Sequence, residues 1–184
     1  MSKMAPTKVV FLLLFTSLGL ADVRDCACDP SKPETMSSRE CGLCREADKL
    51  PPREEIFFLK DINPRKPNRW LAQPRAHAKI GHALEDYPAA LRLKLWNAAI
   101  QKAKELWGDE WGVAMNGDEM RTQCHAHIHI GKLLKGVELE NFIVVADPSE
   151  IPLPKDGDGL WVHPAGTKLH VHVGEQICET VLMR

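Results

Sequence analysis

The apolar residues of this chain recur at two spacings, one typical of strands and the other of a helix. Short or alternating apolar runs flanked by Pro, Gly and Asn predict strands. These runs are Glu55–Lys60, Arg69–Gln73, Trp111–Met115, Gln123–Leu134, Phe142–Ala146, Leu160–His163, Lys168–Val173 and Glu179–Met183. The two runs on either side of Pro164–Gly166 predict a hairpin.

Apolar residues spaced by three and four between Glu85 and Gly108 predict one long helix. The stripe consists of Ala89, Leu91, Leu93, Leu95, Trp96, Ile100, Ala103, Leu106 and Trp107. Asp86 is a suitable cap, Pro88 suits the first turn and Gly108 ends the helix. The order of strands and helix predicts an α+β fold with a mostly antiparallel sheet.

The N-terminal residues 1–21 differ in composition from the rest of the chain. They hold Lys3 and Lys8, no acidic residue and the apolar run Val9–Phe15, a pattern typical of a secretory signal peptide. The run is shorter than the roughly 20 residues of a membrane span, and an uncleaved anchor is the alternative. We therefore expect a periplasmic or secreted protein.

The remaining chain of 22 basic and 25 acidic residues has a net charge of −3, which gives no reason to expect a nucleic-acid partner. Its length predicts one domain. Residues 22–54 are a polar, cysteine-rich arm, residues 55–136 are the α+β core, and residues 137–184 are a C-terminal β-hairpin extension packed on the same domain.

Three histidines at alternate positions carry the chemistry of the core: His125, His127 and His129. In a strand this spacing places the three imidazoles on one face and Ala126 and Ile128 on the other. One interpretation is a half-buried strand whose polar face happens to consist of histidines. A second is a metal site, since imidazole is a frequent metal ligand. The third, which we prefer, is a site where a neutral imidazole attacks phosphorus and its neighbours donate hydrogen bonds to phosphoryl oxygens.

The segment His125–Ile130 resembles the histidine-triad family, whose motif alternates histidine with apolar residues. Asp61–Arg65, Trp70–His77 and Gly112–Asn116 are similar to other motifs of that family, so the resemblance covers about residues 56–134. It implies a histidine-triad-like sheet with one long helix, a nucleotide-containing small molecule as substrate, and in many members a homodimer.

The resemblance also implies roles for individual residues. His127 corresponds to the nucleophile that takes up the nucleotidyl group, and His129 to a phosphate contact. His125 corresponds to the histidine that orients the nucleophile or, in some members, ligates zinc. Asn116 corresponds to an asparagine near the phosphates.

The residues before the triad depart from many soluble members, which place Gln and a small hydroxyl residue four and three positions before the first histidine. Arg121 and Thr122 stand there instead, and Gln123 follows. Asn116 together with this run is similar to the CDP-diacylglycerol pyrophosphatases, which implies a CDP-lipid substrate at a membrane surface. The Arg121 guanidinium suits a phosphate; a solvated turn arginine is the alternative.

The cysteines permit two interpretations. Some histidine-triad proteins hold a structural zinc with a C-x-x-C pair, the histidine after the second strand and the first triad histidine. The corresponding ligands here are Cys41, Cys44, His77 and His125. Export instead favours disulfides among the first four cysteines, Cys26, Cys28, Cys41 and Cys44; an all-cysteine zinc knuckle is a third reading.

A second histidine group, His163, His170 and His172, lies in the predicted hairpin, where we expect an exposed face; a metal or phosphate site is the alternative. His82 and Tyr87 are interpreted as structural. We expect an exported hydrolase of a nucleotide phosphoanhydride or related phosphorus ester or amide that forms a nucleotidyl-histidine. The alternative function is a non-catalytic periplasmic metal-binding protein using the same histidines and cysteines.

Overall fold

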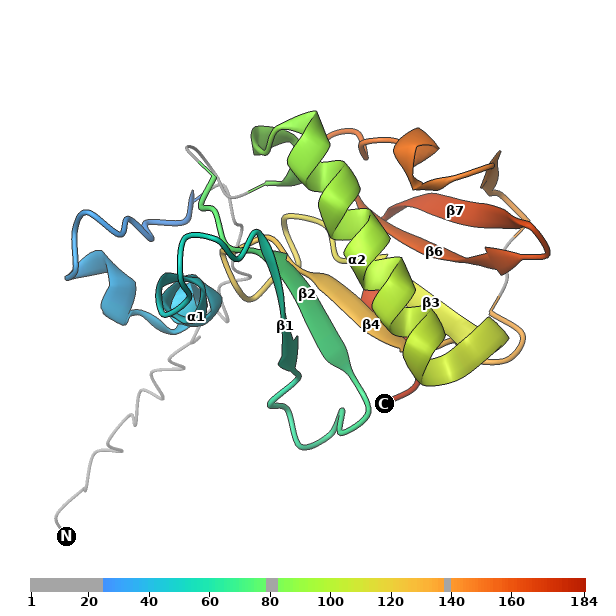
Figure 1. Ribbon diagram of the computed structural model, residues 1–184, viewed down its shortest axis with the longest axis horizontal. Helices are drawn as coiled ribbons and strands as arrows, with labels where there is room; N and C mark the ends of the chain where they lie inside the picture. The colour runs from blue at the N-terminus through green and yellow to red at the C-terminus, as the bar shows by residue number, and fades with distance from the viewer. Residues whose placement is uncertain (1–24, 79–82, 138–139) are drawn as a thin grey trace, which may run out of the picture.

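The computed structural model describes residues 25–78, 83–137 and 140–184, so the predicted signal peptide and His82 lie outside the described residues. Within these ranges, seven strands form one antiparallel sheet in the order β1-β2-β4-β3-β6-β7-β5. The strands are β1 (Ile56–Lys60), β2 (Trp70–Pro74), β3 (Trp111–Met115), β4 (Ile128–Lys132), β5 (Ile143–Val145), β6 (Gly159–Ala165) and β7 (Lys168–Glu175). The predicted α+β class, with an antiparallel sheet and a long helix, is confirmed (Figure 1).

The long helix α2 (Ala89–Trp107) crosses one face of the sheet, as Figure 1 shows. Its buried residues are Leu95, Trp96, Ala99, Ile100 and Ala103. They pack on sheet residues that include Val113, Ile128, Ile130 and Val162. Full burial of each large apolar side chain stabilises the fold by about 1.5–3 kcal/mol, so this face is the main core.

The start of α2 differs from the prediction. Asp86 ends a separate 3-10 turn, Leu84–Asp86, and its Oδ2 accepts a hydrogen bond from Ala83 N at 3.3 Å. Pro88 occupies the cap position and no side chain caps the helix. The predicted cap at Asp86 is wrong because this carboxylate already serves the preceding turn. Ala89 and Leu106 are exposed, so the strip that contacts the sheet is narrower than the predicted stripe.

The histidine strand is shorter than the predicted range 123–134, since β4 begins at Ile128. His129 pairs with Leu71 on one side and Ala114 on the other. Ile128 and Ile130 point into the core beneath α2, so His129 points to the opposite face of the sheet. The alternation of the motif is therefore real in β4, although two of the three histidines precede the strand.

The C-terminal segment covers the face of the sheet opposite α2. Residues Cys178–Val181 form a 3-10 turn, η7, and Leu182 packs with Ala114 and Trp161. A Cβ on Gly112 would lie 2.6 Å from Leu182 Cδ2, so only glycine permits this close approach. The predicted final strand is wrong, because residues 178–181 form a 3-10 turn and the segment is joined to the end of β4 by an isolated bridge, Leu133–Leu182, instead of a ladder.

The C-terminal hairpin continues the same sheet, because β6 pairs with β3 as well as with β7. Ala165 pairs with Lys168, which leaves a two-residue turn at Gly166 and Thr167. Gly166 has φ of 62°, a conformation that favours glycine. The strand therefore runs further toward the turn than the predicted break at Pro164.

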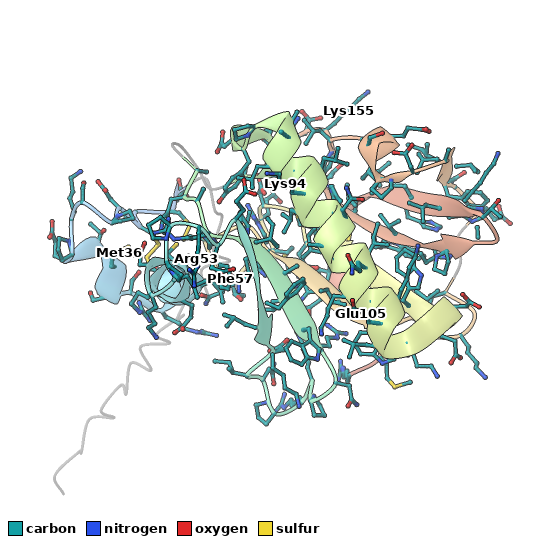
Figure 2. All side chains as sticks on the ribbon, in the orientation of Figure 1. Met36, Arg53, Phe57, Lys94, Glu105 and Lys155 are labelled. Carbon is teal, nitrogen blue, oxygen red and sulfur yellow. A yellow bond between two sulfur atoms is a disulfide. The ribbon has the colours of Figure 1, made fainter. Side chains whose placement is uncertain are left out.

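The cysteine-rich arm lies beside β1 and carries the short helix α1 (Gly42–Asp48) (Figure 1). Two 3-10 turns, Thr35–Ser37 and Arg39–Cys41, lead into α1. Figure 2 shows disulfide sulfurs next to α1, between the arm and the sheet. Among the described residues, none of the helices has the length and apolar character to span a bilayer.

Candidate functional site

The segment before β4 is held by the arm instead of a neighbouring strand. Cys124 N donates a hydrogen bond to Glu40 O at 2.9 Å, and Cys124 forms a disulfide with Cys26. Gln123 Oε1 accepts from Leu43 N at 3.1 Å, and Gln123 Nε2 donates to Arg39 O at 3.1 Å. The bond from Cys124 N satisfies a backbone group that a longer strand would have paired in the sheet, and Gln123 satisfies two backbone groups of the arm. These bonds also fix the approach to His125 and His127.

His127 lines a cavity, and its ring is held in a defined tautomer. Its Nδ1 lies 2.8 Å from the carbonyl oxygen of His125. Because a carbonyl only accepts, Nδ1 carries the hydrogen and Nε2 holds the lone pair. Burial lowers the pKa of His127 to about 4 and Arg121 adds to this, while the His125 carbonyl opposes it. The ring is therefore neutral at physiological pH, with Nε2 left for chemistry.

His129 lies beside His127, with ring centroids 4.9 Å apart in an edge-to-face arrangement. Its side chain is 6% exposed and lines the same cavity. Burial lowers the pKa of His129 well below its usual value, the positive charge of a protonated His127 lowers it further, and Glu179 opposes both effects. Among the described residues, neither ring nitrogen makes a hydrogen bond. The structure thus brings His127 and His129 together in one cavity, as the motif predicts.

The cavity has a volume of about 690 Å³, within the range of sites for small organic ligands. The arm supplies one wall and the β1–β2 region another. Within the described chain, its charged lining is Arg39, Arg45, Lys60, Lys66, Glu46, Asp61 and Glu179. Its apolar lining includes Leu43, Leu59, Leu71 and Met120. This mixture of cations and apolar surface can hold a phosphate beside an apolar group.

Glu179 is the acidic residue nearest the histidines, and sequence reasoning missed it. Its Oε2 lies 2.5 Å from Lys66 Nζ, 2.5 Å from Arg69 Nη1 and 3.6 Å from His129 Nδ1. Burial raises the pKa of Glu179, but His129, Lys66 and Arg69 together outweigh it and lower the pKa to about 2. The residue stands 50 positions after the triad in an unremarkable sequence, so no local signal marked it.

The other predicted substrate contacts differ in position. Asn116 lines the cavity, and its Oδ1 accepts from Glu179 N at 2.9 Å. Gln123 also lines the cavity while it binds the arm. Arg121 is only 1% exposed, pairs with Asp118 at 2.9 Å and does not line the cavity. Arg121 as a phosphate contact is therefore corrected to a buried ion pair that supports the turn before the triad.

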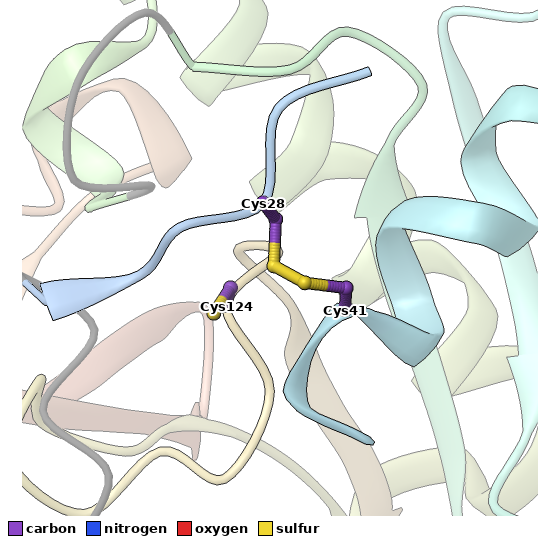
Figure 3. Close-up of side chains that lie close together, drawn as sticks. All are labelled: Cys28, Cys41 and Cys124. Atoms are coloured by element: carbon purple, nitrogen blue, oxygen red, sulfur yellow. A yellow bond between two sulfur atoms is a disulfide. The ribbon is translucent and has the colours of Figure 1, made fainter. Parts of the chain in front are cut away.

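Two disulfides join the described cysteines, Cys26–Cys124 and Cys28–Cys41. Figure 3 shows the Cys28–Cys41 bond with Cys124 beside it. The bond Cys28–Cys41 lies within the predicted set of four cysteines, whereas Cys26 pairs with Cys124, which is distant in sequence, and Cys44 forms no disulfide. Cys41 is consequently removed from the predicted zinc set, since a disulfide sulfur offers no thiolate.

The other three members of that set do come together. Ligand atoms of Cys44, His77 and His125 lie within 4.8 Å of one another. His77 Nε2 donates to Asp48 Oδ1 at 2.7 Å, and His125 Nε2 donates to Pro74 O at 2.6 Å. An oxygen acceptor thus lies behind each ring, and a carboxylate or carbonyl behind a histidine is the usual support of a metal ligand. This Cys/His cluster could hold a metal ion.

The second histidine group is not the exposed face that the sequence predicts. His163 and His172 are 5% and 1% exposed, and their Nε2 atoms lie 3.2 Å apart. Trp161 stacks on His172 with ring centroids 3.6 Å apart, and Phe142 stacks on His170 at 3.8 Å. The aromatic cover explains the burial. Tyr87 is buried, which agrees with its structural interpretation.

Comparisons with known proteins add no family. No protein-family model matches the chain, and no curated protein sequence matches it. The case for a function therefore rests on the residues of the site.

Proposed function

We propose that this protein is an exported histidine-triad-like hydrolase that acts on a nucleotide phosphoanhydride or a related phosphorus ester or amide. The observation that carries the proposal is the hydrogen bond from His127 Nδ1 to His125 O at 2.8 Å. It leaves a neutral Nε2 in a cavity with cationic residues on its wall. A neutral imidazole in this setting can attack phosphorus and form a phosphoramidate.

His127 attacks the phosphorus, and the bond to the leaving group breaks. Water then attacks the nucleotidyl-histidine, and the phosphorus–nitrogen bond breaks to restore His127. Lys66 and Arg45 favour an anionic phosphate in the cavity, while Leu59 and Leu71 offer an apolar surface for a base or an acyl chain. A CDP-lipid presented at a membrane surface is one substrate of this class.

Turnover by protein purified after export tests the proposal directly. The substrate panel holds CDP-alcohols, dinucleoside polyphosphates and nucleoside phosphoramidates. His127→Ala should lower kcat at least about 10³-fold, as loss of a nucleophile does in other covalent mechanisms. His170→Ala removes a histidine outside the cavity and should leave kcat unchanged.

Stereochemistry gives a second test of the same mechanism. Two displacements at phosphorus predict net retention with a chiral substrate. Inversion would exclude the nucleotidyl-histidine, and activity that survives His127→Ala would exclude this nucleophile.

A structural zinc at Cys44, His77 and His125 is a further part of the proposal. These residues belong to α1, the loop after β2 and the segment before β4, so a metal would brace the arm against the sheet. Tetrahedral zinc places sulfur and nitrogen ligands roughly 3.3–3.7 Å apart, and the cluster needs only a small contraction to reach this.

The same cluster also favours the second candidate, an exported metal-binding protein without turnover. Metal stoichiometry separates the two. One tight metal that survives His127→Ala supports a structural metal beside an enzyme site. Several metals lost with the triad histidines, together with no turnover across the panel, would support the binding protein.

A further inference from the structure

The C-terminal segment delivers a carboxylate to the triad histidines. Glu179, in η7, lines the cavity, and its Oε2 lies 3.6 Å from His129 Nδ1. Its side chain is only 18% exposed. A carboxylate in a site for anionic phosphate opposes binding, so its position calls for a role in the chemistry or in the fold.

Hydrogen bonds to backbone groups hold this segment in addition to the ion pairs of the Glu179 carboxylate. Arg69 Nη2 donates to Glu179 O and to Leu182 O, each at 2.6 Å, and Arg69 Nε donates to Met183 O at 3.1 Å. The backbone N of Glu179 is bound by Asn116 at 2.9 Å. These four bonds use backbone groups and remain in a Glu179→Gln protein. The effect of the carboxylate on His129 can therefore be tested while these four bonds keep the segment in place.

The charges around His129 determine which ring nitrogen holds the hydrogen. An ionised carboxylate only accepts hydrogen bonds, so Glu179 favours a hydrogen on Nδ1 of His129. Lys66 and Arg69 both bind Oε2 and keep the carboxylate ionised. His127 is the remaining titratable neighbour of His129, at 4.9 Å between ring centroids. The Nε2 of His129 is then the atom that can gain and lose a proton in the cavity.

We propose that Glu179 is a positioning residue that keeps a hydrogen on His129 Nδ1, so that His129 Nε2 carries a proton to the leaving group. The inference rests on the proposed function and assigns different tasks to two adjacent histidines. His127 has a carbonyl behind its ring and serves as nucleophile, whereas His129 has a carboxylate behind its ring and serves as acid. An anionic phosphate entering the cavity draws a proton onto His129 Nε2.

The proton account balances over both steps. In the first, His127 Nε2 bonds to phosphorus, the bond from phosphorus to the leaving oxygen breaks, and the proton on His129 Nε2 moves to that oxygen. In the second, water bonds to phosphorus, the phosphorus–nitrogen bond breaks, and a water proton returns to His129 Nε2. One water is consumed, and both histidines return to their starting states.

The tautomer of His129 is measurable without any substrate. Long-range proton–nitrogen NMR of the ¹⁵N-labelled protein reports which ring nitrogen is protonated, and His129→Asn assigns the signals. We expect the Nδ1–H form in the wild type. In Glu179→Gln the amide can donate to a bare Nδ1, so the Nε2–H form should replace it. An Nε2–H form in the wild type, or the same tautomer in both proteins, would overturn the proposal.

Leaving-group dependence separates a positioning role from damage to the fold. Glu179→Gln should lower kcat on the order of 10²-fold for an alkyl ester of a nucleotide, whose alkoxide leaving group needs acid assistance. It should lower kcat far less for a p-nitrophenyl nucleotide ester, whose leaving group needs none. Equal loss on both substrates would mean structural damage and would overturn the role of Glu179.

A matched control removes another carboxylate from an ion pair. Glu110 Oε2 lies 2.6 Å from Lys132 Nζ, and neither residue lines the cavity. Glu110→Gln should change neither the tautomer nor the leaving-group dependence. If the wild type hydrolyses no substrate, the proposed function and the proton delivery both fail, while the NMR result still decides whether Glu179 sets the His129 tautomer.

Discussion

At the scale of single residues, competing electrostatic effects decide the state of the site. Burial favours the neutral form of every ionisable group. For His127, burial prevails over the opposing effects of the His125 carbonyl and the Glu179 carboxylate, and the ring stays neutral. Glu179 is partly buried, but His129 together with Lys66 and Arg69, both at 2.5 Å, prevails over burial and keeps the carboxylate ionised. One cavity thus holds a neutral imidazole, that of His127, and a fixed negative charge, that of Glu179.

The depressed pKa of Glu179 predicts acid sensitivity. Its folded pKa of about 2 lies below the ordinary value of 4.5, so the unfolded chain binds more protons between these pH values. The free energy of unfolding should fall as pH drops from 4.5 to 2, by about 3 kcal/mol at most from this group.

Urea unfolding of the wild type and Glu179→Gln at a series of pH values measures this contribution. The difference between the two proteins should be largest above pH 4.5 and vanish near pH 2. A difference that stays constant with pH would show that the carboxylate is not ionised by its partners in the folded state.

Residue chemistry also explains which site residues could be predicted. His127 and His129 are uncommon residues at a regular spacing, so their pairing was visible in the sequence. Glu179 and Lys66 are common surface residue types, and only the fold of the C-terminal segment brings them together at 2.5 Å. The predicted phosphate contact of Arg121 rested on its guanidinium group. In the structure Arg121 is buried in an ion pair with Asp118 and does not line the cavity.

At the scale of elements, the arm replaces part of the predicted histidine strand. Gln123 and Cys124 bond to the arm, and the Cys26–Cys124 disulfide closes a sequence separation of 98 residues. The arm then forms a wall of the cavity through Arg39, Leu43 and Arg45. Its attachment therefore affects both stability and the shape of the site.

The two disulfides should differ in their effect on stability. A cross-link stabilises more when it closes a longer loop, and the second one, Cys28–Cys41, spans only 13 residues. Replacing Cys26 and Cys124 by Ser should cost roughly 4–5 kcal/mol, and replacing Cys28 and Cys41 roughly 3 kcal/mol.

Urea denaturation of the two double variants checks this order. The variant without Cys26–Cys124 should also show a raised KM, because the arm lines the cavity. Equal costs, or the reverse order, would mean that local packing of the sulfur cluster outweighs chain entropy.

At the scale of the whole molecule, the Cys/His cluster joins three parts of the chain that are distant in sequence. Burial raises the pKa of the Cys44 thiol to about 11, and Asp48 adds to this. A metal must displace the thiol proton, so its affinity should fall as pH falls. The two disulfides fit an extracellular or periplasmic location, where such a metal would brace the arm.

Cobalt binding tests the cluster with a matched control in the same chain. We expect one Co²⁺ per chain and a sulfur-to-cobalt charge-transfer band that is lost in Cys44→Ser. Cys178 is the other free cysteine among the described residues, and it is buried on the face of the sheet opposite α2. Cys178→Ser should therefore keep the band. A band that survives Cys44→Ser would remove this cysteine from the site.

The sequence by itself determined the elements whose signal is local. Strand alternation and helix spacing predicted β1, β2, β3 and the body of α2. Each of these elements has a periodic burial pattern that residues close together in the sequence reveal. The same alternation marked His127 and His129 as the centre of the site.

Tertiary structure decided everything that depends on distant partners. In the folded chain Cys26 forms a disulfide with Cys124, and Cys44 lies close to His77 and His125. Arg121 is buried, and Glu179 lies beside His129. The tertiary structure also shortened β4, because the arm and not a strand satisfies the preceding backbone. Pairing energies between groups far apart in sequence leave no periodic trace, so only the folded chain reveals them.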